Sequence, residues 1–252
     1  MKLVANPDDL LCREIATAPN LKWSFAEIHA AHQQLVSSAK MHDAVRHAWI
    51  TQQLPWFKKW NEECEPVRLY CMHINFDGFI TFPLDNRPGV DAILSAALLN
   101  ICTIEVTMAF RDITGGKDVA SSGYQEHLKS EAMVAGQIVS ETTLYRRDSG
   151  RIVAKQQSKM SSSDRKFSDW QRGIEHALNK KKTQKIENGS NDSKLVVYAY
   201  GLSGHPGFKR GARDFSDIVA MVDQSAFENN FDETIVMSYD PGWFFSYLPN
   251  SR

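Results

Sequence analysis

The sequence GVDAILSAALLNICTIEVTMA spans residues 89–109 and contains two short apolar runs, each with one carboxylate inside it. Asp91 belongs to the first run and Glu105 to the second. Charged side chains are almost never buried in a strand without a partner, so each acid requires a metal ion, a cationic side chain or a hydrogen-bond network beside it. On a strand, Glu105 and Thr107 point to the same face. If the two runs are neighbouring strands, Asp91, Glu105 and Thr107 converge at one edge of a sheet.

Asp91, followed about a dozen residues later by Glu105, Val106 and Thr107, resembles the Asp…(Asp/Glu)-x-Lys signature of the restriction-endonuclease-like, or PD-(D/E)XK, nuclease superfamily. In that superfamily the two acids bind Mg²⁺ and the lysine helps to orient or activate the attacking water. The resemblance implies Asp91, Glu105 and Thr107 as catalytic positions, and Asp91 and Glu105 as ligands of Mg²⁺ or Mn²⁺. Thr107 departs from the signature, because its hydroxyl cannot supply the positive charge of the lysine that it replaces. Candidates for that charge are Lys129 and Lys155.

The resemblance implies an α+β fold with an α/β-like core, in which N-terminal helices precede a mixed sheet of the restriction-endonuclease-like type flanked by helices. The chain has 252 residues and is 42% hydrophobic, which is enough for one sizeable core. We divide it into an N-terminal helical extension over residues 1–66 and a nuclease-like α/β domain over residues 67–252. The two parts can also form one continuous domain.

Helix signals dominate the first quarter of the chain. Ser24 and Glu27 match a capping box, which predicts the start of a helix. A further helix is expected over about residues 41–61, kinked or split at Pro55. From residue 67 the hydrophobic period changes to that of strands, and the middle of the chain is expected to form an antiparallel meander. Strands are expected over residues 67–74, 78–82, 90–94, 102–108, 194–200 and 233–238.

The histidines and cysteines do not show the spacing of a metal site. His29 and His32 lie three residues apart on a predicted helix, but a zinc site needs three or four ligands, so we interpret them as solvated or core-edge side chains. The cysteines lack Cys-x-x-Cys spacing, which favours thiols in a reducing, cytoplasmic compartment. No run has the length of a membrane span, so no membrane partner is expected. The cysteines are Cys12, Cys64, Cys71 and Cys102.

A predicted helix beginning near residue 123 supplies secondary site candidates, Gln125 and Glu131. They come from a looser resemblance to bacterial proteins in which a Glu-x-Thr strand is followed by a helix with a Tyr-Gln pair and a further glutamate. The alternative interpretation of Glu131 is an ordinary solvent-facing side chain.

The one basic segment lies between residues 146 and 185, which contain about twelve basic and four acidic side chains. A hairpin over residues 142–156 and a helix from about residue 163 to 182 carry these charges, and two basic elements can follow a phosphate backbone. Because the net charge of the chain is −1, contact with nucleic acid must come from such a local patch. The alternative is a solvated helix face whose lysines complement the helix dipole. The candidate contacts are Arg146, Arg147, Arg151, Lys155, Arg165 and Lys166.

Three functions are therefore open. The first is a metal-dependent nuclease that hydrolyses phosphodiester bonds of DNA or RNA. The second is a catalytically degenerate nuclease-like scaffold that binds nucleic acid or protein, which the absent lysine and the near-zero net charge favour. The third is an unrelated α+β protein in which Asp91 and Glu105 are structural ion-pair partners, for instance of Arg68 or Arg111.

Overall fold

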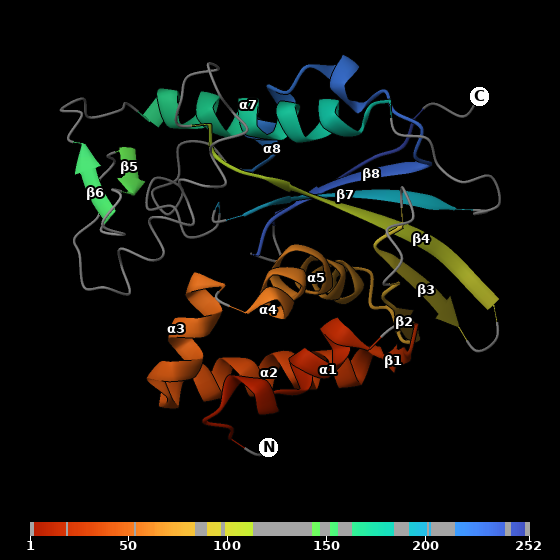
Figure 1. Cartoon of the computed structure of the whole chain (residues 1–252). Coiled ribbons are helices and arrows are strands. Elements are labelled where there is room, and N and C mark those ends of the chain that lie inside the picture. Colours follow the sequence, from red (N-terminus) through yellow and green to blue (C-terminus); the bar gives the residue numbers. More distant parts are fainter. Residues whose placement is uncertain are drawn as a thin grey trace.

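A seven-stranded mixed sheet with helices on both faces forms the centre of the molecule (Figure 1). The computed structural model describes residues 3–18, 20–52, 54–83, 90–96, 99–112, 143–146, 152–155, 163–183, 192–200, 202, 215–239 and 243–249. The fold is therefore α+β, with an open sheet flanked by helices, as the sequence predicts. No helix in these ranges is both long enough and apolar enough to cross a membrane.

The sheet has the strand order β1-β2-β3-β4-β7-β8-β9. Strands β1 to β4 pair antiparallel, β4, β7 and β8 are parallel, and β9 is antiparallel to β8. The antiparallel meander predicted for the middle of the chain is confirmed by the pairs β2–β3 and β3–β4. The strands are β1 (Lys22–Ser24), β2 (Phe79–Thr81), β3 (Ala92–Ala96), β4 (Leu99–Ala109), β7 (Ser193–Ala199), β8 (Glu233–Met237) and β9 (Phe244–Tyr247).

The helices begin where local sequence signals predict. Ser24 and Glu27 form the capping box at the start of α2, with the Ser24 N–H donating to Glu27 Oε2 at 2.8 Å. Pro55 opens α4 and so splits the single helix predicted over residues 41–61. The helices are α1 (Leu11–Thr17), α2 (Phe25–Met41), α3 (Asp43–Thr51), α4 (Pro55–Lys59), α5 (Glu65–His73), α7 (Ser163–Lys181) and α8 (Phe215–Ala220), with a π-helical turn η2 (Trp60–Cys64) and the 3₁₀ turns η1 (Pro7–Asp9) and η5 (Gln224–Phe227).

Two hydrophobic cores lie on opposite faces of the sheet. The first joins helices α1 to α5 to one face, and the second joins α7 and α8 to the other (Figure 1). Strand β7 contributes to both, since Val196 belongs to the first core while Leu195 and Val197 belong to the second. A strand that is covered on both faces carries apolar side chains at consecutive positions, which explains the apolar run in the sequence of β7.

The strand predicted over residues 67–74 is wrong, because these residues form most of helix α5. Its aromatic and β-branched content is typical of a strand, but Cys64, Val67 and Cys71 recur at helical spacing and are fully buried in the first core. Helix α5 also runs across the boundary drawn between residues 66 and 67. The place beside β2 that was expected for residues 67–74 is taken by β1, a three-residue strand that was not predicted, while β3 pairs with the other edge of β2.

A separate two-stranded sheet pairs β5 (Thr143–Arg146) with β6 (Ile152–Lys155). Its antiparallel register confirms the strands of the hairpin predicted over residues 142–156. Helix α7 agrees with the helix predicted from about residue 163 to 182, and its apolar residues at helical spacing are buried in the second core. These are Phe167, Trp170, Ile174 and Leu178.

Candidate functional site

Asp91, which directly precedes β3, lies near Glu105 of β4 where these antiparallel strands pair. Ala92 pairs with Ile104 in the register of these strands, and the Asp91 N–H donates to the Ile104 carbonyl oxygen at 2.7 Å. Ile104 therefore faces both Ala92 and Asp91, and Asp91 lies near enough to Glu105 for the charge of Glu105 to contribute to its raised pKa. The structure brings together the two acids that the sequence singles out.

Asp91 is a carboxylic acid held in an environment that disfavours its charge. Burial raises its pKa to about 7, and the nearby charges of Glu105 and Glu63 add to this effect. The Val106 N–H, which donates to Asp91 Oδ2 at 2.7 Å, and the charge of Lys181 oppose the rise. Asp91 thus titrates near neutral pH.

Lys181 is the cation that contacts Glu105. Its Nζ donates to Glu105 Oε1, and the Glu105 side chain is only 7% exposed. Lys181 ends helix α7, which packs on the face of β4 opposite the first core, the same face that Glu105 occupies. In the sequence, Lys181 belongs to the basic segment, as a possible phosphate contact or as a complement of the helix dipole, and its spacing along the chain gives no sign that it reaches Glu105.

Of the two lysines predicted to replace the signature lysine, Lys129 lies outside the described residues. Lys155 ends β6, and its side chain is likewise not described. Thr107 is buried, at 6% exposure, two residues beyond Glu105 on β4. Gln125 and Glu131 also lie outside the described residues.

Glu63 adds a third carboxylate to the electrostatics of this site. It lies in the π-helical turn η2, and burial raises its pKa, with a contribution from the charge of Glu105. Lys59 lies 3.7 Å from Glu63 and compensates part of this cost. Single π-helical turns of this kind are frequent at functional sites. Within the described part of the chain, however, no group of three or more His, Cys, Asp or Glu side chains is arranged to hold a metal ion.

Arg68 and Arg111, the partners expected if the two acids were structural, pair with other carboxylates. Arg68 donates to both oxygens of Glu65, at 2.6 and 2.8 Å. Arg111 Nε lies 3.4 Å from Asp169 Oδ2, so it ties the end of β4 to α7. Among the residues that the structure describes, Lys181 forms an ion pair with Glu105.

His29 and His32 belong to a buried polar network rather than to the site. His32 Nδ1 lies 3.0 Å from Glu65 Oε2, and His29 Nδ1 lies 3.3 Å from Arg68 Nη1. Burial, followed by the charge of Arg68, lowers the pKa of His29. The two histidines of α2 thus contact the Glu65–Arg68 ion pair of α5.

The predicted nucleic-acid contacts are only partly placed. Arg146 ends β5, Lys155 ends β6, and Arg165 and Lys166 lie in the first turn of α7, but their side chains are not described. Arg147 and Arg151 fall outside the described residues.

Comparison of the chain with protein-family models, with curated proteins and with solved structures finds no match.

The elevated pKa of Asp91 leads to a testable pH dependence of stability. Between about pH 4 and pH 7 the folded protein keeps a proton that the unfolded chain releases, so the free energy of unfolding is expected to fall as pH rises through this range and to level off above it. Asp91→Asn cannot ionise and retains an oxygen for the Val106 N–H. At pH 8 this variant is expected to be about 1–3 kcal/mol more stable than wild type. Urea denaturation at pH 4, 6 and 8 measures the difference.

Asp9→Asn, at an exposed position in the 3₁₀ turn η1, is the control and is expected to leave the pH profile unchanged. A gap between wild type and Asp91→Asn that stays constant from pH 4 to pH 8 would contradict the assignment of an elevated pKa to Asp91.

Proposed function

We propose that the chain is a metal-dependent nuclease of the restriction-endonuclease-like type, which hydrolyses phosphodiester bonds of DNA or RNA. One observation carries the proposal: Asp91 lies near Glu105 where β3 and β4 pair, so that the charge of Glu105 acts on it, and Lys181 from α7 contacts Glu105. Two acids and a lysine are the groups of the superfamily signature. Here the lysine comes from a distant helix instead of from the position of Thr107.

The topology supports the same proposal. Helix α5 precedes the antiparallel meander β2–β3–β4, and the resemblance implies such a helix followed by three meandering strands. One acid directly precedes β3 and the other lies within β4, and these are the second and third strands of this meander. Helix α7 then leads to β7, which is parallel to β4.

The donor set suits a hard divalent cation. Mg²⁺ prefers oxygen ligands and is commonly bound through one or two carboxylates together with waters and substrate phosphates. Asp91 and Glu105 are therefore sufficient as protein ligands without a third acid. Burial and the neighbouring acids disfavour the charge of Asp91, and a divalent cation would offset that cost. When bound, Mg²⁺ or Mn²⁺ supplies polarisation of the phosphodiester and activation of water.

Lys181 takes the role that Thr107 cannot. Its flexible side chain carries three donors and a full charge, so it can exchange the carboxylate of Glu105 for a phosphate oxygen or a water. The Val106 N–H fixes one oxygen of Asp91 and leaves the other oxygen to accept from water or to bind a cation. Asp91 and Glu105 then act as ligands, and Lys181 stabilises negative charge on the phosphate.

A second candidate is a nuclease-like scaffold that binds nucleic acid or protein without cleaving it. The observation that favours it is the internal pairing of both acids, since Asp91 accepts from Val106 and Glu105 pairs with Lys181. Such pairing also stabilises carboxylates that have no catalytic role.

Glu105→Gln is expected to lower metal-dependent cleavage of DNA or RNA by about 100-fold or more, because it removes a charged ligand with little change in volume. Mn²⁺ and Mg²⁺ are titrated into wild type and the variant, and cleavage of single- and double-stranded substrates is measured in the same samples. Thermal stability with and without the metal provides a second readout, since a bound ion stabilises the folded wild type.

Two matched controls accompany this measurement. Lys181→Met is expected to lose cleavage, whereas Lys180→Met, at the neighbouring exposed position of α7, is expected to retain it. Glu228→Gln changes an exposed glutamate and is expected to cleave like wild type. Equal cleavage by wild type and Glu105→Gln would refute the assignment. Nucleic-acid binding without cleavage would establish the second candidate.

A further inference from the structure

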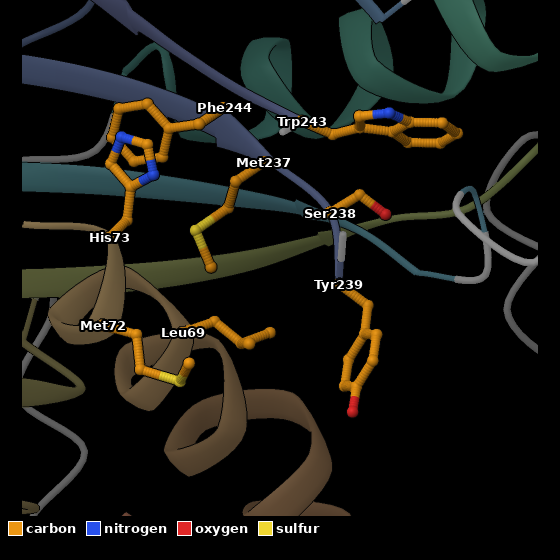
Figure 2. Close-up of a pocket in the computed structure, with 8 residues that line it drawn as sticks. All are labelled: Leu69, Met72, His73, Met237, Ser238, Tyr239, Trp243 and Phe244. Carbon is orange, nitrogen blue, oxygen red and sulfur yellow. The ribbon is translucent and has the colours of Figure 1, made fainter. Parts of the chain in front are cut away.

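A pocket of about 90 Å³ opens between the last turn of α5 and the connection from β8 to β9 (Figure 2). Leu69, Met72 and His73 line it from α5, and Met237 lines it from the end of β8. The rest of the wall comes from residues 238–239 and 243–244. None of these residues takes part in the Asp91–Glu105 site.

Stacked rings support two walls of the pocket. The His73 and Phe244 rings lie nearly parallel, with centroids 3.5 Å apart and an interplanar angle of 10°. Trp243 lies at 5° to Phe215 of α8, with centroids 6.1 Å apart. Figure 2 shows Trp243 and the His73–Phe244 stack on either side of Met237. Rings that pack against each other in this way are partly held in position by their neighbours, which lowers the entropic cost of binding.

The chemistry of the wall is aromatic and thioether. Met72 and Met237 are polarisable and interact favourably with aromatic rings. Ser238 already forms two hydrogen bonds within the protein. Its Oγ donates to the Ala199 carbonyl oxygen at 3.2 Å, and its N–H donates to the Trp243 carbonyl oxygen at 3.0 Å. The polar groups that remain on the described wall are the imidazole of His73 and the hydroxyl of Tyr239.

The described wall of the pocket is uncharged. No acidic side chain, lysine or arginine is among the described residues that line the pocket. Behind Met72, the Arg68 guanidinium lies 2.7 Å from the Met72 sulfur, but both oxygens of Glu65 compensate its charge. The described wall thus offers a ligand aromatic and thioether contacts rather than an ion pair, which suits a neutral ring.

We propose that this pocket binds a neutral, single-ring aromatic compound that carries one hydroxyl group, that is, a compound of the phenol class. The ring packs against the His73–Phe244 stack, Trp243 and the two thioethers, and the hydroxyl reaches the His73 imidazole or the Tyr239 hydroxyl. The volume suits one ring, since a cavity of about 150 Å³ encloses a whole benzene and this pocket is open on one side. The proposal is independent of the nuclease activity.

The test is a titration of phenol into the full chain labelled at its methionine methyl groups, followed by NMR. The Met72 and Met237 signals are expected to shift and saturate at millimolar phenol, while that of Met41, which is 67% exposed on α2, stays in place. Cyclohexanol, which has a similar size and the same hydroxyl, is expected to bind about fivefold more weakly because it lacks the ring. Tyr239→Ala, at an exposed position, is expected to weaken phenol binding several-fold without unfolding the protein.

Three outcomes would overturn the proposal: no saturable shift, equal binding of phenol and cyclohexanol, or shifts of Met41 equal to those of Met72. Glu105→Gln is expected to bind phenol like wild type. This comparison separates a failure of the pocket from a failure of the nuclease assignment.

Discussion

Gly173→Ala is expected to destabilise the protein by about 3 kcal/mol, although alanine normally favours a helix by about 1 kcal/mol over glycine. Gly173 is in the middle of α7, where a Cβ would lie 2.0 Å from the Phe110 carbonyl oxygen and 3.0 Å from its carbon. Both contacts are with backbone, which cannot rotate away. The added methyl group must therefore push α7 away from the end of β4.

The same close approach positions ion pairs between α7 and the end of β4. Arg172 Nε donates to Asp112 Oδ2 at 2.7 Å, and the Asp112 N–H donates to the Asp169 carbonyl oxygen at 2.9 Å. Lys181 ends the same helix, so a displaced α7 would also separate Lys181 from Glu105. Gly173→Ala is thus expected to reduce any activity that depends on this pair.

Urea denaturation of Gly173→Ala and wild type measures the effect. Asn179→Ala is the matched control, because Asn179 is exposed on the same helix, and its effect is expected to stay within about 0.5 kcal/mol. If Gly173→Ala were as stable as wild type, or more so, α7 and β4 would not pack at backbone distance.

Arg68→Met is expected to destabilise the protein by about 3–5 kcal/mol, since it leaves a buried carboxylate without its cation. Glu65 is 8% exposed and Arg68 is 2% exposed, so water replaces little of the lost interaction. Burial raises the pKa of Glu65, but hydrogen bonds from Arg68 and His32 outweigh this effect and hold it below its usual value. Without Arg68 that pKa rises, and the loss of stability is therefore larger at pH 8 than at pH 5.

Denaturation of Arg68→Met at both pH values measures this loss. The control is the double variant Glu65→Gln with Arg68→Met, which removes both charges and is expected to recover part of the stability. If Arg68→Met lost less than about 1 kcal/mol at pH 8, the buried pair would not be the constraint that the structure implies.

Sequence patterns with a local cause were reliable guides. The capping box of Ser24 and Glu27 and the helical spacing in α7 depend on residues within a few positions of each other, and the structure agrees with both. The strand prediction for residues 67–74 failed because it relied on the local composition alone. The aromatic and β-branched composition of these residues favours a strand, but they are buried against the neighbouring helices and form helix α5.

The candidate site likewise has one part that the sequence predicts and one part that only the packing of the elements decides. The placement of Asp91 and Glu105 in adjacent apolar runs follows from the alternation of side chains along strands, and the antiparallel register brings the two acids together. Which lysine contacts Glu105 depends on where α7 crosses β4 and on how that helix is rotated about its axis, and here it is Lys181. Neither is encoded by spacing along the chain.

The sequence alone therefore determined the meander, its two buried acids and the long amphipathic helix, because hydrophobic periodicity and capping are local properties. The tertiary structure alone decided that Lys181 meets Glu105, that Gly173 must lack a side chain, and that α5 and the β8–β9 connection enclose a pocket. Each of these depends on close packing between segments far apart in the chain. Their distance and orientation are set by the order of the strands and by the two cores on either side of the sheet.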